Sequence, residues 1–84
     1  MKLELFMFPT CPYCRRVLGF LEQSGRTDVE LYNIHENKED LQRLVAVGGM
    51  NQVPCLFIDG KPLYESLDII AWLKEHPQEQ TEAL

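Results

Sequence analysis

Two cysteines three positions apart are the residues of this 84-residue chain whose spacing predicts chemistry. Cys11 follows a short apolar segment that ends at Pro9, and Pro12 is suited to the first turn of a helix. A sulfur at a helix N-terminus is favoured as the thiolate, because unpaired N–H groups and the helix dipole stabilise its charge. Cys14 falls one turn later on the same side of the helix. We therefore predict that Cys11 attacks a disulfide and that Cys14 resolves the mixed disulfide.

The alternative interpretation of the same motif is half of a structural zinc site. A closed tetrahedral site needs four ligands, and the chain has no second CxxC pair. Cys55, His35 and His76 are the remaining candidate ligands, and their positions show no ligand spacing. Redox chemistry is favoured over metal binding, and we expect no metal cofactor. Arg15 and Arg16 add positive charge near the motif and are given a supporting role only.

Composition restricts the class of protein. With 45% hydrophobic and 25% charged residues in 84, the chain has the composition of one soluble globular domain. A net charge of -5 argues against nucleic acid as a partner, and the absence of an apolar run of about 18 residues argues against a membrane span. The N-terminus does not have the layout of a signal peptide. We expect a cytoplasmic protein that acts as a monomer.

Hydrophobic patterns predict the elements that position the two cysteines. We expect a strand at about 2–8, a helix from Pro12 to Ser24-Gly25, a strand from Val29 to Ile34, a helix capped by Asn37 and ending at Gly48-Gly49, a strand over 53–58, a hairpin turn at Asp59-Gly60, a strand from Lys61 to Tyr64, and a last helix capped by Ser66 and stopped by Pro77. A βαβ unit makes the first two strands parallel, and the hairpin makes the last two antiparallel. The prediction is an α/β fold in the order β-α-β-α-β-β-α, with a four-stranded mixed sheet and three flanking helices. We expect residues 1–77 to form the domain and residues 78–84 to form a flexible tail.

The strand, the CPYC motif, the helix and a later Val-Pro together resemble the glutaredoxins, whose active site is typically CPYC. The match in element order covers about residues 1–76 and implies a thioredoxin-like fold. It also implies that Pro54 follows a cis peptide bond, and that the backbone of Val53 pairs with the cysteinyl part of glutathione. The alternative is that Pro54 only begins a strand. Tyr13 is placed over the thiol and along the glutathione groove, or else is a solvent-facing spacer.

Glu65-Ser66 resembles the pair that begins the last helix in the glutathione-binding domain of glutathione transferases. This implies that Ser66 and its N–H hold the γ-glutamyl carboxylate while Glu65 pairs with the ammonium group; the alternative is that Ser66 only caps the helix. The chain departs from the glutaredoxin pattern at Phe8, where many members have a lysine for the glycyl carboxylate. Gln52 replaces a common threonine. Gln52 and Arg15 are the remaining candidates for binding the glycyl carboxylate of glutathione.

The resemblance implies a glutathione-dependent thiol–disulfide oxidoreductase that reduces protein disulfides and protein–glutathione mixed disulfides, with glutathione as co-substrate. Its catalytic residues would be Cys11 and Cys14, and glutathione would contact Tyr13, Gln52, Val53, Pro54, Glu65 and Ser66. Two alternatives stay open: a thioredoxin-like electron donor recharged by a flavin reductase, and a glutathione-binding module or iron–sulfur carrier. The γ-glutamyl site favours the first function over the electron donor. Cys55 is expected to be a core residue without a catalytic role.

Overall fold

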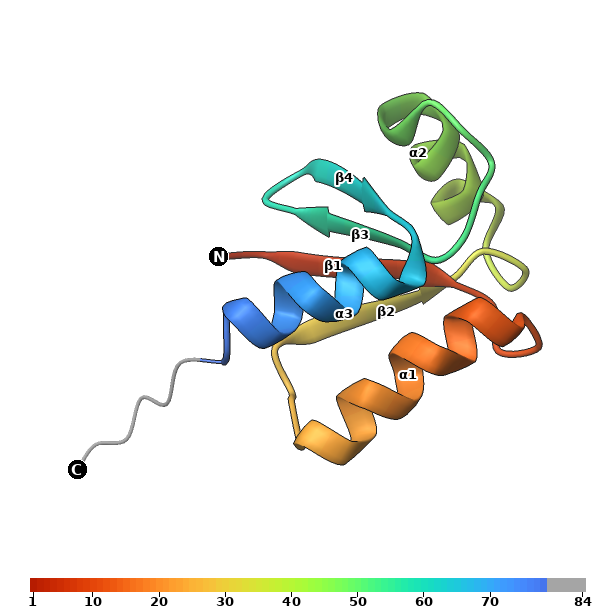
Figure 1. Cartoon of the computed structure of the whole chain (residues 1–84). Helices are drawn as coiled ribbons and strands as arrows, with labels where there is room; N and C mark the ends of the chain where they lie inside the picture. Colours follow the sequence, from red (N-terminus) through yellow and green to blue (C-terminus); the bar gives the residue numbers. More distant parts are fainter. Residues whose placement is uncertain (79–84) are drawn as a thin grey trace.

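The computed structural model describes residues 1–78, which form one four-stranded sheet flanked by three helices (Figure 1). The elements are β1 (Leu3–Met7), α1 (Pro12–Ser24), β2 (Val29–Asn33), α2 (Lys38–Gly48), β3 (Cys55–Ile58), β4 (Lys61–Tyr64) and α3 (Ser66–Glu75). The strand order is β2-β1-β3-β4, with β1 and β2 parallel and the other pairs antiparallel. The predicted mixed sheet and element order are confirmed. The third strand begins at Cys55, two residues later than predicted.

The central strand β1 is buried on both faces. Leu3 and Leu5 pack against α1 and α3, whereas Phe6 belongs to a second cluster with Leu44 of α2. Alternation along a strand normally leaves one face in water, but here helices cover both faces. Glu4, the charged residue of β1, is consequently only 2% exposed.

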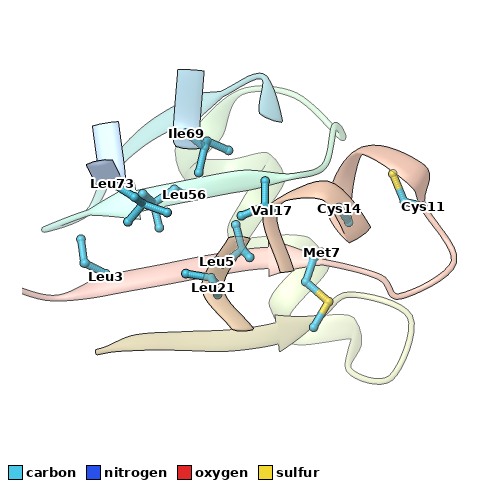
Figure 2. Packing of buried hydrophobic residues seen from close by; sticks show 10 residues of the cluster. All are labelled: Leu3, Leu5, Met7, Cys11, Cys14, Val17, Leu21, Leu56, Ile69 and Leu73. Atoms are coloured by element: carbon cyan, nitrogen blue, oxygen red, sulfur yellow. The ribbon is translucent and has the colours of Figure 1, made fainter. Parts of the chain in front are cut away.

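Figure 2 shows the larger of the two hydrophobic clusters, which lies between the sheet and the helices α1 and α3. Val17 of α1 and Ile69 of α3 are fully buried against Leu5 and Leu56 of the sheet. Burying one aliphatic side chain of this size contributes about 1.5–3 kcal/mol. Cys11 and Cys14 lie at one end of this cluster, so the packing that stabilises the domain also fixes the motif.

Local sequence signals explain where several elements begin and end. The Asn37 side chain accepts a hydrogen bond from the Glu39 N–H at 2.9 Å, which confirms the predicted cap of α2. Asp59 and Gly60 have φ angles of 50° and 87°, the geometry of a tight hairpin turn, as predicted. Gly25 ends α1 with φ 69°. Within residues 1–78, no helix is both long enough and apolar enough to cross a membrane.

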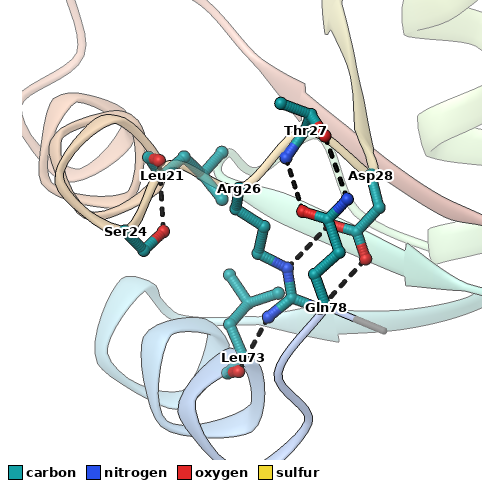
Figure 3. A network of polar contacts seen from close by, with 7 residues as sticks. All are labelled: Leu21, Ser24, Arg26, Thr27, Asp28, Leu73 and Gln78. Atoms are coloured by element: carbon teal, nitrogen blue, oxygen red, sulfur yellow. Dashed lines mark hydrogen bonds and ion pairs between the residues drawn. The ribbon is translucent and has the colours of Figure 1, made fainter. Parts of the chain in front are cut away.

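A polar network ties the end of α3 to the loop between α1 and β2 (Figure 3). Arg26 donates to both carboxylate oxygens of Asp28, at 2.7 and 3.1 Å, and to the Leu73 carbonyl at 2.8 Å. Gln78 accepts from the Thr27 N–H at 2.7 Å and donates to its hydroxyl at 2.9 Å. The predicted tail at 78–84 thus begins with a residue bonded to the domain. The remainder of that tail, 79–84, lies outside the described residues.

Candidate active site

Cys11 occupies the N-cap position of α1, directly after the loop that follows β1. Its carbonyl accepts the Arg15 N–H at 2.9 Å, and its own N–H donates to the Phe8 carbonyl at 3.2 Å. The first turn of α1 contains no acidic residue. The dipole of α1 therefore acts on the Cys11 sulfur without an opposing carboxylate in that turn, while no N–H of the first turn is hydrogen-bonded to the side chain of Cys11. The predicted place of Cys11 at a helix N-terminus is confirmed.

Cys14 is fully buried one turn further along α1. The pKa of its thiol is raised to about 12, mainly by burial and to a smaller extent by the neighbouring Cys11, while a hydrogen bond with the Phe8 backbone opposes the rise. Cys14 is therefore a thiol at neutral pH. Its sulfur lies within hydrogen-bond reach of Cys11, which is the placement that a resolving cysteine needs.

The third cysteine lies in a different part of the core. Cys55 is fully buried in the cluster on the α2 side of the sheet, and burial raises the pKa of its thiol to about 11. It is a free thiol, as are Cys11 and Cys14. The predicted burial of Cys55 is confirmed, and its surroundings give it no means of attacking a disulfide.

The six residues predicted to bind glutathione line one groove of about 360 Å³. Tyr13 comes from α1, residues 52–54 from the segment between α2 and β3, and Glu65 and Ser66 from the start of α3. The Val53–Pro54 peptide bond is cis, as the resemblance implied. Three segments that are far apart in the sequence thus meet in one cavity of a size that accommodates a small ligand.

The start of α3 differs from the prediction, because Ser66 is not its cap. Glu65 holds the N-cap position, makes no side-chain hydrogen bond to the first turn, and has φ 77° and ψ 120°. A positive φ is rare for a residue with a side chain, so the backbone here is strained. Ser66 is the first residue of the helix and is 5% exposed. The first turn therefore has N–H groups without a side-chain acceptor, which is the arrangement that binds a carboxylate.

Polar and charged side chains lie in the groove and next to it. Gln52 donates to the Glu65 carboxylate at 3.3 Å across the groove. Arg16 lies with its guanidinium carbon 5.8 Å from the centre of the Tyr13 ring. Of the two residues predicted to bind the glycyl end of glutathione, Gln52 lines the groove and Arg15 does not. Among residues 1–78, no group of three or more His, Cys, Asp or Glu side chains is placed to hold a metal ion.

Tyr64 is a residue near the groove that the sequence analysis did not select. It ends β4, directly before Glu65, and its hydroxyl donates to the Met50 carbonyl at 3.1 Å. Its position next to Glu65 was the available signal in the sequence. The contact with Met50 depends on the packing of β4 against α2 and has no local signature.

Comparisons with known proteins agree with this arrangement. A family model described as Glutaredoxin matches residues 3–63. A probable glutaredoxin of Synechocystis sp. is 31% identical over 71 residues, which cover 83% of this chain and 80% of the relative. The holo form of glutaredoxin C1 from Populus tremula x tremuloides is 25% identical with a TM-score of 0.66, over 88% of this chain and 75% of that one. Glutathione transferase Omega 3C from Trametes versicolor is 25% identical with a TM-score of 0.75, over 89% of this chain but only 33% of the transferase. The chain has the predicted thioredoxin-like fold and belongs to the glutaredoxin family of thiol–disulfide oxidoreductases.

Proposed function

We propose that this protein uses glutathione to reduce protein disulfides and protein–glutathione mixed disulfides. The groove carries the proposal: it begins at Tyr13, two residues from Cys11, and ends at Glu65 and Ser66 on α3. A tripeptide thiol in this groove with its sulfur at Cys11 has its γ-glutamyl group at the start of α3. Because such exchange needs an excess of reduced glutathione, we place the protein in the reducing cytoplasm.

Each of the two charged groups at the γ-glutamyl end of glutathione has a proposed partner in the groove. The γ-glutamyl carboxylate accepts hydrogen bonds from Ser66 and the first turn of α3, where no side chain caps the helix. The γ-glutamyl ammonium group pairs with the Glu65 carboxylate. The backbone of Val53 pairs with the cysteinyl residue as an added strand does. The isopeptide bond and the cysteinyl residue, which join the charged γ-glutamyl end to the sulfur, then lie along Pro54 and Tyr13.

Removal of glutathione from a glutathionylated substrate requires only one sulfur of this protein, that of Cys11. The Cys11 thiolate attacks the glutathione sulfur of the mixed disulfide, the substrate sulfur leaves as thiolate and takes a proton, and a Cys11–glutathione disulfide forms. A second glutathione thiolate then attacks the glutathione sulfur of that disulfide. Oxidised glutathione leaves and Cys11 returns as thiolate. In the net reaction one glutathione thiol is oxidised, the glutathione sulfur of the mixed disulfide passes into oxidised glutathione, and one substrate thiol is released.

Reduction of a protein disulfide requires Cys14 as well. Cys11 attacks the substrate disulfide, and Cys14 must then lose its proton and attack Cys11 to release the second substrate thiol. The charge of Cys11 is gone once its sulfur is in a disulfide, so one cause of the raised pKa of Cys14 is removed, but burial remains. Of the two activities, this favours deglutathionylation, which does not require Cys14 to lose its proton. The resulting Cys11–Cys14 disulfide is reduced by two glutathione molecules.

A recharging assay tests the proposal. Wild-type protein should turn over with glutathione and glutathione reductase, and not with thioredoxin reductase. Cys14→Ser should keep deglutathionylation but lose reduction of protein disulfides, whereas Cys11→Ser should lose both activities. Cys55→Ser is the control and should keep both. Recharging by thioredoxin reductase alone would favour the electron donor and refute the proposal.

A charge substitution tests the γ-glutamyl site directly. Glu65→Gln keeps the shape of the side chain and removes the charge that pairs with the ammonium group. Because Glu65 is exposed, we expect the KM for glutathione to rise only about 2- to 5-fold. Asp68→Asn is the matched control, since it removes an acidic charge in the same first turn of α3 from a residue that does not line the groove. Equal KM values for Glu65→Gln and Asp68→Asn would contradict the proposed role of Glu65.

A further inference from the structure

The two walls of the groove come from separate segments, residues 52–54 before β3 and residues 65–66 at the start of α3. We propose that Tyr64 is a positioning residue that holds these walls at the separation glutathione requires. The inference rests on the glutathione-dependent function proposed above. Tyr64 itself does not line the groove, so it acts through the residues that do.

Tyr64 is joined to both walls. Its peptide bond leads directly to Glu65, the first residue of the α3 wall. Its hydroxyl donates to the carbonyl of Met50 at 3.1 Å, and Met50 lies two residues before Gln52, where the other wall begins. One side chain therefore links the segment between α2 and β3 to the start of α3. The hydrogen bond from Gln52 to Glu65 at 3.3 Å spans the groove at this separation.

The body of the Tyr64 side chain is also held. Tyr64 lies opposite Cys55 in the β3–β4 pairing and packs against the buried cluster on the α2 side of the sheet. Its hydroxyl contacts the Cys55 thiol, and burial raises the pKa of Tyr64, so the phenol keeps its proton at neutral pH. The hydroxyl is thus available as a donor to Met50. Because the aromatic ring is rigid and held at its base, the position of β4 determines where the hydroxyl meets the segment between α2 and β3.

The last residue of α2 is shaped to receive the Tyr64 hydroxyl. A Cβ atom added to Gly48 would overlap the hydroxyl oxygen and lie 3.3 Å from the ring carbon that carries it. Gly48 has no positive φ, so helix geometry does not require glycine here, and alanine would ordinarily favour the helix. Space for the Tyr64 hydroxyl is the physical reason for glycine at this position. Gly48 and Tyr64 therefore act as one unit.

The coupling between these two residues provides the test. Tyr64→Phe removes only the hydroxyl and should raise the KM for glutathione about 3- to 10-fold, the effect of one lost hydrogen bond, while kcat at saturating glutathione stays within about twofold. Gly48→Ala should raise KM at least as much, because its methyl group displaces the hydroxyl. In Gly48→Ala/Tyr64→Phe the overlap with the hydroxyl oxygen is absent and only the approach of 3.3 Å to the ring carbon remains, so KM should be close to that of Tyr64→Phe alone.

Two matched controls separate positioning from general loosening. Tyr32→Phe removes a hydroxyl that bonds Glu30 on the edge strand β2, and Gly19→Ala adds a methyl group in α1 where no atom lies within 4 Å. Both should leave KM unchanged. Binding of S-methylglutathione, measured by calorimetry, gives a second readout that needs no turnover, and it should weaken in Tyr64→Phe by the same factor as KM rises.

The outcomes distinguish this inference from the function on which it rests. If wild-type protein neither turns over with glutathione nor binds S-methylglutathione, the proposed function fails, and the role of Tyr64 fails with it. If wild type does both and Tyr64→Phe equals it in KM and in binding, the function stands and the positioning role is overturned. Additive effects of Gly48→Ala and Tyr64→Phe, or an equal rise in Tyr32→Phe, would also overturn it.

Discussion

Replacing Cys11 with serine should leave two thiols that barely react with an alkylating agent at neutral pH. The remaining cysteines, Cys14 and Cys55, are both fully buried, and burial is the main cause that raises each pKa, to about 12 and about 11. Serine at position 11 removes the smaller contribution that Cys11 makes to the pKa of Cys14 and leaves the effect of burial. The reactive species is the thiolate, so the thiolate fraction sets the rate.

The expected magnitudes follow from these pKa values. At pH 7, a free cysteine with a pKa near 8.5 is about 3% thiolate, whereas Cys14 is about 10⁻⁵ thiolate and Cys55 about 10⁻⁴. Relative to free cysteine, alkylation should therefore be slower by roughly 3,000-fold at Cys14 and 300-fold at Cys55. Burial also blocks access and slows alkylation further, whereas the greater nucleophilicity of a thiolate with a high pKa and, in Cys11→Ser, the missing contribution of Cys11 to the pKa of Cys14 act in the opposite direction.

Iodoacetamide labelling followed by intact-mass measurement is the assay. Native wild-type protein should take up one label quickly, and protein unfolded in urea should take up all three, the number of cysteines in the chain. Native Cys11→Ser should take up none on the same timescale. If Cys14 in that variant reacted within tenfold of free cysteine, the assignment of attack to Cys11 alone would be refuted, and Cys14 could replace it in exchange.

Three further predictions concern stability, measured by urea unfolding. Glu4→Gln removes the carboxylate that accepts from Arg43 at 2.6 Å and should cost about 1–2 kcal/mol at pH 7, because Arg43 is 41% exposed and regains water. The Arg43 hydrogen bond lowers the pKa of Glu4 in the folded protein. This stabilisation is therefore present above pH 4.5, the ordinary pKa of glutamate, and is lost as the pH falls through the lower pKa of the folded state. The free energies of unfolding of wild type and Glu4→Gln should become equal in acid. Asn37→Ala should cost about 1 kcal/mol through the lost cap of α2. Gly19→Ala should stabilise α1 by up to about 1 kcal/mol, because no atom lies within 4 Å of the added methyl group. A lower free energy of unfolding would contradict this open surrounding of Gly19.

Local signals in the sequence were sufficient for much of the fold and the candidate site. Hydrophobic periods placed the strands and helices in the correct order, because each pattern depends on neighbours within a few residues. The CPYC motif placed Cys11 at a helix N-terminus for the same reason. The residues of the two groove walls followed from resemblance to families in which those segments meet. Once those residues were chosen, the predicted topology was enough to place them in one cavity.

Features that depend on tertiary packing were missed. Ser66 was assigned as the cap of α3, because serine is a preferred cap, but the chain reaches that helix through Glu65 at positive φ. The alternation of β1 gave no sign that Glu4 would be buried, since burial follows from α2 covering the second face. Tyr64 carries no motif, and its contact with Met50 joins residues 14 positions apart.

The two faces of the sheet contribute differently to the candidate site. The thiols of Cys11 and Cys14 belong to the cluster on the α1 and α3 side, so packing changes there act on the reacting sulfur. The position of α2 depends on the opposite face, where Glu4 binds Arg43 and Tyr64 contacts the end of the helix. Because α2 leads into the groove wall at residues 52–54, changes on that face should alter the proposed binding of glutathione more than the reactivity of Cys11. A single small domain can in this way separate the chemistry of its nucleophile from recognition of the proposed co-substrate.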